Sequence, residues 1–261
     1  MNGTSFIVDG NGSSYAGNFS LNSGTLIVGT SNDSASSSIF GGDVNTASNT
    51  IVTGYGNISG NLTLNNNAAL LLLSDNANDN LYVNSLTLND GSIINTNYTL
   101  TSLSNNSLPL MNVNTLNVSG DVSLLLNTNI TNLDTNINNV NSTNLYDYGN
   151  SSSLVQYQVI NASMVGIGAN TQVTLKDLDG NTYSNTDALV YYDLTDNVGR
   201  VSFDILSTVQ TNGIYVGYGL TEIEAFSGKT VTLNSTNASG NILNAKLTGD
   251  GSFTFTGNQS T

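Results

Sequence analysis

The chain has 261 residues, with 18 acidic residues, four basic residues, no His and no Cys, and its formal net charge is −14. The absence of His and Cys excludes a Ser-His-Asp triad, a disulfide framework and a zinc site built from those ligands. The negative charge argues against nucleic acid and anionic membrane surfaces as partners, because phosphate recognition requires a positive surface. We therefore expect neutral glycans, other proteins or further copies of this chain as partners.

The polar residues are mainly Asn, Ser, Thr and Gly, and only 8% of all residues are charged. Asn and Gly disfavour helix interiors, whereas Thr and Val favour strands, so an all-β fold is predicted. Met1 is followed by polar residues instead of the basic and apolar segments of a signal peptide. The apolar run 68–73 is too short to span a bilayer. We expect no direct membrane insertion of this segment, and an export signal encoded elsewhere.

Residues 1–145 contain a short recurring module, in which two apolar residues flank a variable position and precede Asn or Ser and small polar residues. This alternation is typical of a strand with one buried face, and the polar residues suit a tight corner. Successive starts lie 18 residues (Val44 to Leu62) to 30 residues (Leu86 to Leu116) apart, which suits one coil of a β-solenoid per module. The module starts are Phe19, Val44, Leu62, Leu86 and Leu116.

Asn residues follow the strand in several modules, as Asn22, Asn65 and Asn89 do. Two interpretations stay open. The amides of successive coils hydrogen-bond to one another in a ladder, or each Asn simply provides the backbone conformation that a tight turn requires.

Residues 146–212 have a different pattern. Alternating segments at 156–159, 172–175, 189–192 and 201–205 are separated by the turn signals Asp179-Gly180-Asn181 and Asp196-Asn197. This pattern predicts antiparallel β-hairpins that are inserted in the solenoid or project from it. Residues 213–261 return to the coil pattern.

The two ends of the chain are similar to each other. Residues 4–13 and 251–260 share Ser, Phe, Gly, Asn and Ser in register, with Phe253 lying 247 positions after Phe6. We interpret the chain as one unit of a long tandem array, in which residues 213–261 lead into the next repeat.

Several coils carry motifs of a known family. Tyr15-Ala16-Gly17-Asn18-Phe19 followed by 23–29 is similar to the YxGxFxxxxGTLxVG coil of autotransporter adhesin passengers, and 214–223 is similar to their GYGLT segment. The chain therefore resembles bacterial autotransporter adhesin passengers of the AIDA-like, self-associating type. The resemblance implies a right-handed parallel β-helix outside the cell, on the surface of a Gram-negative bacterium. The tandem period departs from the shorter family members and implies a very long stalk.

Two groups of residues are candidate binding sites. Tyr157, Tyr191 and Tyr192 in the hairpin region are candidate ligand-binding residues, because aromatic rings stack on sugar rings. Asp177, Asp179 and Asn181 resemble a calcium loop, although the Gly stands at the fourth position and no Glu closes the loop. A hairpin turn explains the same residues without a metal, and we expect no other cofactor.

Catalysis on a polysaccharide is the remaining alternative among solenoid functions. Hydrolysis requires two carboxylates, one of them with a raised pKa. Glu222 and Glu224 lie on one face of a predicted strand, where exposed charges that discourage unwanted strand pairing explain them better than catalysis does. With no His and only one Arg, Arg200, the chain is predicted not to be an enzyme.

These observations predict an extracellular adhesin repeat that acts in cell–cell aggregation or attachment by self-association of rod-like solenoids. Two alternatives stay open. The chain is a module that binds a host-surface glycan or protein through the hairpin region, or it is a passive stalk that separates a binding domain from the cell.

Overall fold

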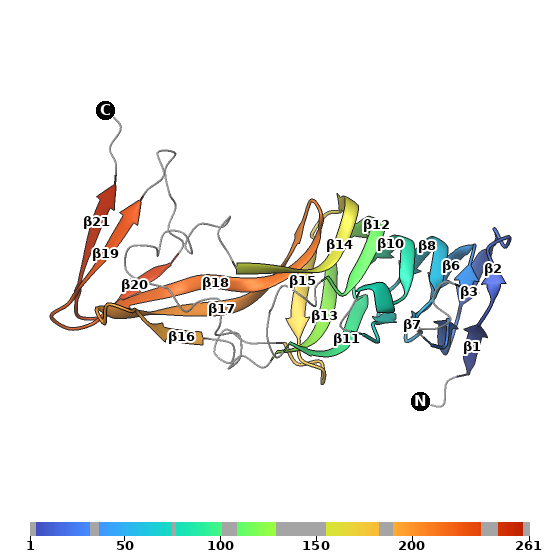
Figure 1. The fold of residues 1–261 in the computed structure, drawn as a ribbon, viewed down its shortest axis with the longest axis horizontal. Helices are drawn as coiled ribbons and strands as arrows, with labels where there is room; N and C mark the ends of the chain where they lie inside the picture. Colours follow the sequence, from blue (N-terminus) through green and yellow to red (C-terminus); the bar gives the residue numbers. More distant parts are fainter. Residues whose placement is uncertain are drawn as a thin grey trace. The chain divides into compact units, whose positions relative to one another are not determined.

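The computed structural model describes residues 4–31, 37–74, 77–100, 109–128, 155–182, 190–235 and 245–257. These residues form an all-β structure with mostly parallel sheets and a single 3₁₀ turn, η2 (Ala77–Asp79), which confirms the predicted fold class at this level (Figure 1). No helix within these ranges is both long and apolar enough to cross a membrane. The chain divides into two compact units, which we describe separately. Unit 1 comprises residues 1–128, 157–182 and 207–216, and unit 2 comprises 129–156, 183–206 and 217–261.

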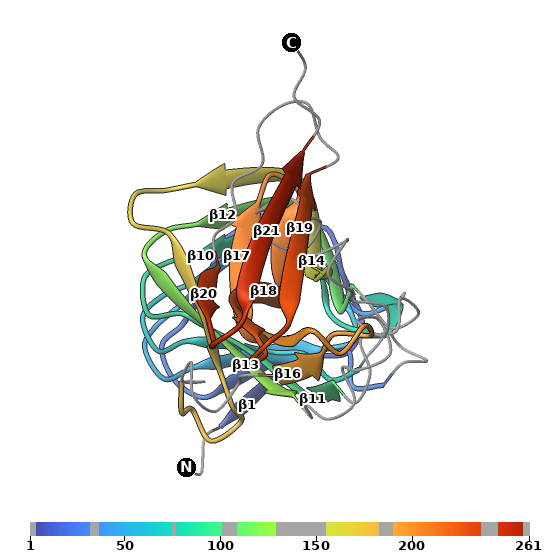
Figure 2. The ribbon, with the colours of Figure 1, turned by 90° about the vertical axis from the view of Figure 1, so that its left-hand side faces the viewer.

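In unit 1 the chain passes repeatedly between two sheets. Sheet A contains, in order, β1 (Ser5–Val8), β4 (Thr25–Val28), β7 (Ile51–Gly54), β9 (Ala69–Leu71), β11 (Ile93–Leu100), β13 (Asp121–Thr128) and β15 (Gln172–Lys176). Sheet B contains β2 (Asn11–Gly12), β5 (Ile39–Phe40), β8 (Asn57–Leu64), β10 (Tyr82–Leu88), β12 (Met111–Val118) and β14 (Val155–Ile167). Sheet B also contains β3 (Asn18–Leu21) and β6 (Asp43–Thr46). β3 pairs in parallel with β6, and β6 pairs in parallel with β8. Neighbouring strands such as β10 and β12 run parallel, side by side in both views (Figures 1 and 2).

The predicted module starts occupy one register position of sheet B. Each start pairs with the next, so that Phe19, Val44, Leu62, Leu86 and Leu116 form a single column. The last four of these side chains are almost completely buried. A second buried column runs through sheet A and consists of Leu26, Val52, Leu70, Ile94, Leu124 and Leu175. Each such Leu or Ile contributes about 1.5–3 kcal/mol by leaving water, so these two columns form a large part of the core of unit 1.

The corners before the sheet A strands adopt left-handed backbone conformations. Only Gly, and to a lesser extent Asn, enters this region without a large steric cost. At Gly91 (φ 74°) a Cβ atom would also lie 2.4 Å from the Asn66 Oδ1 atom, so no other residue fits there without rearrangement. The corner residues with positive φ are Gly24, Asn49, Asn67, Gly91, Gly120 and Asn170. The predicted role of Asn and Gly in tight corners is therefore confirmed.

The predicted Asn ladder is present between Asn65 and Asn89, whereas Asn22 forms no side-chain hydrogen bond within the described part of the chain. Asn89 donates from Nδ2 to Asn65 Oδ1 at 2.8 Å, and Asn65 donates from Nδ2 to the Thr46 backbone oxygen at 2.6 Å. Both interpretations of Asn hold, at different positions, because the corner residues Asn49 and Asn67 serve the turn. Two further amide pairs, Asn84 with Asn114 and Asn112 with Asn161, link neighbouring strands of sheet B.

The ladder gives a graded prediction for stability. Asn89→Ala removes one side-chain hydrogen bond and should lower the free energy of unfolding by about 1 kcal/mol. Asn65→Ala removes two and also leaves the Thr46 oxygen without its amide donor, so the loss should be about 2 kcal/mol. Urea unfolding of both variants measures the difference, and equal midpoints would contradict the ladder as a stabilising element.

The antiparallel hairpins predicted for 146–212 leave out the parallel pairing of its first two strands. β14 pairs in parallel with β12, with Ile160 beside Met111, and β15 pairs in parallel with β13, with Val173 beside Val122. The alternation of buried and exposed residues is the same in parallel and antiparallel strands, so it does not reveal direction. The parallel pairing of unit 1 therefore extends to Lys176, beyond the predicted boundary at residue 145.

Unit 2 contains the antiparallel pair that was predicted and a return to parallel pairing. β16 (Val190–Asp193) and β17 (Gly199–Gln210) are antiparallel, and their turn has Asn197 at φ 53°. β18 (Gly213–Ala225) pairs in parallel with β20 (Lys246–Thr248), and β19 (Thr230–Ser235) with β21 (Ser252–Gly257). The parallel strands after residue 213 agree with the expected return to the coil pattern.

Candidate binding surface

The outward positions of sheet B in unit 1 form an uncharged polar surface. Thr63, Thr87 and Asn117 pair in register on β8, β10 and β12, and each stands between two buried apolar residues of its own strand. Asn61, Ser85 and Thr115 occupy the outward position two residues earlier on the same strands. None of the residues in these three strands is charged. We name these six residues the polar face.

One of the two rows of the polar face, formed by Thr63, Thr87 and Asn117, has unused hydrogen-bonding capacity. Within the described part of the chain, the side chains of Thr63, Thr87 and Asn117 form no hydrogen bond, and all three are partly exposed. The Asn ladder side chains differ, because their amides already bond to each other. The polar face can therefore offer hydroxyl and amide groups, each a donor and an acceptor, to a partner.

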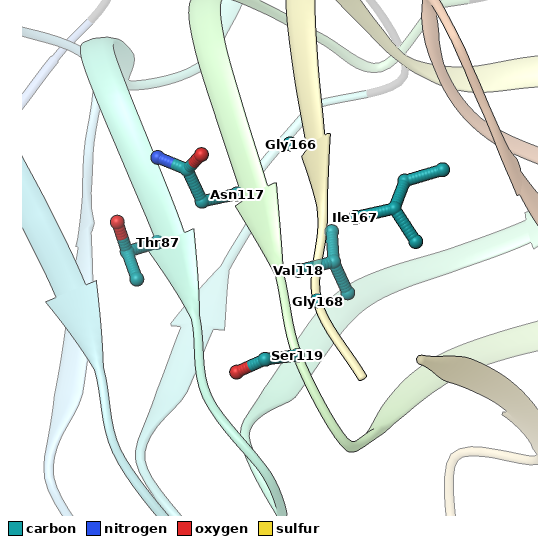
Figure 3. A pocket seen from close by; sticks show the side chains of 7 residues that line it. All are labelled: Thr87, Asn117, Val118, Ser119, Gly166, Ile167 and Gly168. Carbon is teal, nitrogen blue, oxygen red and sulfur yellow. The ribbon is translucent and has the colours of Figure 1, made fainter. Parts of the chain in front are cut away.

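A shallow hollow lies at the end of the polar face, where Gly166 on β14 follows Asn117 in register (Figure 3). A Cβ atom at Gly166 would lie 2.4 Å from the Asn117 Oδ1 atom, so the missing side chain creates the space. Ile167 on β14, which lines the hollow, has 54% of its surface accessible. The lining residues are Thr87, Asn117, Val118, Ser119, Gly166, Ile167 and Gly168.

The hollow measures about 280 Å³, which is below the size of most pockets that enclose a small-molecule ligand. It has room for a protruding side chain or for part of a sugar ring. The geometry of unit 1 thus favours an extended, flat contact over an enclosed binding site.

Thr63, Thr87 and Asn117 stand at the variable position of the sequence module, between two buried apolar residues, as in Leu86-Thr87-Leu88. The sequence predicted self-association of the solenoids but did not identify which of their residues make the contact. The available signal was the repeated choice of Thr or Asn, and never a charged residue, at this position of three modules.

The three predicted tyrosines lie on strands, but their side chains fall outside the described residues. The Tyr157 backbone belongs to β14. Tyr191 and Tyr192 belong to β16, where their backbones pair with Ser202 and Val201. Their assignment to ligand binding stays a prediction.

The calcium candidates form a tight turn in unit 1. The Asp177 carboxylate accepts hydrogen bonds from the Asn181 backbone nitrogen at 2.7 Å and from its Nδ2 atom at 2.9 Å. Lys176 and Thr182 form an antiparallel bridge at the base of the turn, as a hairpin requires. Because both carboxylate oxygens of Asp177 receive donors, the turn interpretation accounts for Asp177 and Asn181. Asp179 is exposed at the tip.

The Asn181 side-chain hydrogen bond, followed by the Asn181 backbone hydrogen bond, lowers the pKa of Asp177 from its ordinary value of 3.8. The folded turn therefore gains stability from the ionised carboxylate above the ordinary pKa, and it loses this contribution as pH falls through the lowered pKa. Asn181→Gly should return the pKa of Asp177 toward 3.8. An NMR titration of the Asp177 carboxyl carbon tests this, and an unchanged midpoint would show that the side-chain bond is not the cause.

The two glutamates lie in unit 2 on one face of β18, as predicted, with the buried Ile223 between them. Glu224 forms an ion pair with Arg200, and Glu222 accepts a hydrogen bond from Thr248 Oγ1 at 2.6 Å. β18 is flanked by β17 and β20, so these residues do not stand on an open edge. Arg200 is therefore part of an ion pair on the surface, which is worth about 0–1 kcal/mol.

The described residues contain no group of three or more His, Cys, Asp or Glu side chains arranged to hold a metal ion. Comparison with known proteins gives no match, since no protein-family model, curated protein or solved structure is significantly similar to this chain.

Proposed function

We propose that unit 1 is a right-handed parallel β-solenoid and that the chain is a repeat of an extracellular bacterial surface adhesin. In this proposal it acts by binding and not by catalysis, and it joins neighbouring cells by self-association. The parallel register of two buried columns over successive passages supports the solenoid. The motifs shared with autotransporter adhesin passengers support the surface of a Gram-negative bacterium as its location.

The observation that carries the proposal is the polar face. Two copies of an uncharged surface with free hydroxyl and amide groups can approach without charge repulsion at the contact and form hydrogen bonds in both directions. Such contacts are individually weak, because each replaces a bond to water and yields about 0.5–1.5 kcal/mol. Repetition along an array makes the second and later contacts intramolecular, which raises the overall strength by orders of magnitude.

The hollow beside Asn117 favours a second candidate function, the binding of a host-surface glycan. Sugar rings present hydroxyl groups at their edge and an apolar face, and the hollow combines the Asn117 amide with the exposed Ile167. This candidate differs from the predicted site in the hairpin region, which depends on the tyrosines.

The test is the settling of cells that display two or more linked copies of the chain, compared with cells that display an unrelated rod. Self-association predicts rapid settling that excess soluble chain inhibits. Settling should strengthen as salt is raised, because the charge of −14 per copy opposes approach over distances that salt screens. Settling that weakens with salt would contradict the proposal. Binding to glycan-coated surfaces without settling would favour the second candidate.

A further inference from the structure

The repeated segment at the two ends of the sequence forms a strand in both places. Ser5-Phe6-Ile7-Val8 is β1, and Ser252-Phe253-Thr254-Phe255, at the same offset of 247 positions, opens β21. In both segments the Phe after Ser lies on the side of the strand that faces a buried residue of the neighbour. Phe6 pairs with Leu26, and Phe253 pairs with Val231. β21 thus repeats β1 in sequence, in conformation and in the direction of its side chains.

The two strands have different neighbours. β1 pairs with β4, the strand that follows it in its sheet, whereas β21 pairs with β19, a strand that precedes it in the chain. If β1 and β21 are equivalent, β1 should pair on its free edge with a strand like β19, because β21 pairs with β19. The strand that fits the free edge of β1 is therefore a copy of β19, in the register of β19 with β21.

The free edge of β1 has the properties of an unfilled contact. In the described part of sheet A, β1 is the terminal strand and pairs only with β4. Phe6, whose column partner Leu26 is fully buried, has 50% of its surface exposed, and Ile7 has 53% exposed. The Phe6 ring stacks on Phe19 with the ring centroids 5.1 Å apart. Exposed aromatic and aliphatic groups at a strand edge favour the addition of another strand.

We propose that β1 of one copy of this chain pairs in parallel with β19 of the preceding copy, with Phe6 opposite Val231 and Ile7 opposite Thr232. In the two-copy arrangement, residues 4–13 of the second copy take the place that 251–260 occupy in a single copy. Phe6 then lies between Val231 and Leu26, two residues that are each fully buried in their own units. This inference concerns the junction between copies and does not depend on adhesion.

The same geometry explains why separate chains should not join in this way. In a single copy, β21 already covers β19 over six paired residues. A β1 strand from another molecule would have to displace a strand of the same chain, whose effective concentration is much higher. The junction therefore forms within one continuous polypeptide.

The experiment uses a two-copy chain, in which residues 4–250 are followed directly by a second copy that starts at residue 4. The chain has no Cys, so two introduced thiols report on a single pair of positions. Thr232→Cys in the first copy is combined with Ile7→Cys in the second. Registered positions on neighbouring strands lie within the Cα separation that a disulfide or a short thiol-bridging reagent spans. Thr230→Cys with Ile7→Cys is the matched control, since Thr230 lies about 7 Å farther along the same face of β19.

The proposal predicts that the Thr232 and Ile7 thiols become linked in most molecules, while the control pair remains largely unlinked. Thr232→Cys with Thr254→Cys in a single copy is the positive control, because these two positions already pair in the structure. Linkage of the Thr232 and Ile7 thiols no greater than that of the Thr230 control would overturn the proposal. Because the readout is a covalent bond, it is independent of whether displaying cells settle.

Discussion

Cells that display linked copies of the variant Thr87→Glu/Asn117→Glu are expected to settle no faster than cells that display an unrelated rod. Both substitutions lie at outward, partly exposed positions of the polar face, so the buried columns should remain intact. When two such faces meet, the added carboxylates oppose each other at the contact. Like charges brought together at an interface cost several kcal/mol, which exceeds the yield of a few hydrogen bonds.

The sign of the charge provides a sharper form of the test. Cells that display Thr87→Lys/Asn117→Lys should likewise fail to settle alone, since the repulsion is the same in kind. Mixed with the glutamate cells, they should settle together, because the two faces now attract each other. Only a contact of this face with itself predicts recovery in the mixture.

A matched control separates this local effect from total charge. Thr195→Glu/Ser227→Glu adds the same charge at two exposed turn positions of unit 2 and should leave settling unchanged. If the control abolishes settling as fully as the polar-face variant does, net charge and not the polar face governs the association. Circular dichroism of each variant verifies that the strand content is retained.

Asn80→Ala should destabilise unit 1 more than any surface substitution. Asn80 is almost completely buried, and its amide forms four hydrogen bonds with residues that the structure describes. Its oxygen accepts from the backbone nitrogens of Leu73 and Ser74, and its Nδ2 atom donates to the backbone oxygens of Ser74 and Leu110. Each buried group that loses its partner costs about 1–3 kcal/mol, so a total loss of about 3 kcal/mol or more is expected.

Urea unfolding followed by circular dichroism measures this loss. Asn45→Ala is the control, because Asn45 is an exposed outward residue of β6, and its replacement should change the free energy of unfolding by no more than about 0.5 kcal/mol. Asn80→Asp should also be destabilising, because it replaces the donating NH₂ group by an acceptor. A midpoint for Asn80→Ala equal to that of Asn45→Ala would show that water replaces the amide without loss.

The register of the parallel strands was predictable because apolar residues mark it. Phe19, Val44, Leu62, Leu86 and Leu116 are apolar residues at equivalent places in the module, and burial requires that they align. The corners were predictable for a similar reason, since left-handed backbone positions select Gly and Asn.

Two features could not be predicted. The column continues from Leu116 to Val165, 49 positions later, and no pattern in the sequence shows that β14 resumes parallel pairing after so long an interval. The role of Asn80 is also hidden, because its partners come from separate backbone segments and leave no periodic signal. For the binding surface, the module shows which positions face outward, but the unused hydrogen-bonding capacity of Thr87 and Asn117 is evident only from the structure.

The parallel register has a mechanical consequence. Paired positions in unit 1 are separated by as few as 18 residues (Val44 and Leu62) and as many as 51 (Val122 and Val173), yet each strand bonds only to the strands beside it. Under a pulling force, such as fluid flow exerts on attached cells, strands should detach one passage at a time, each releasing a different length of chain. Stretching of single molecules should show this as a series of unequal extension steps. The chain would then yield gradually under load, and passages that remain folded would keep their contacts.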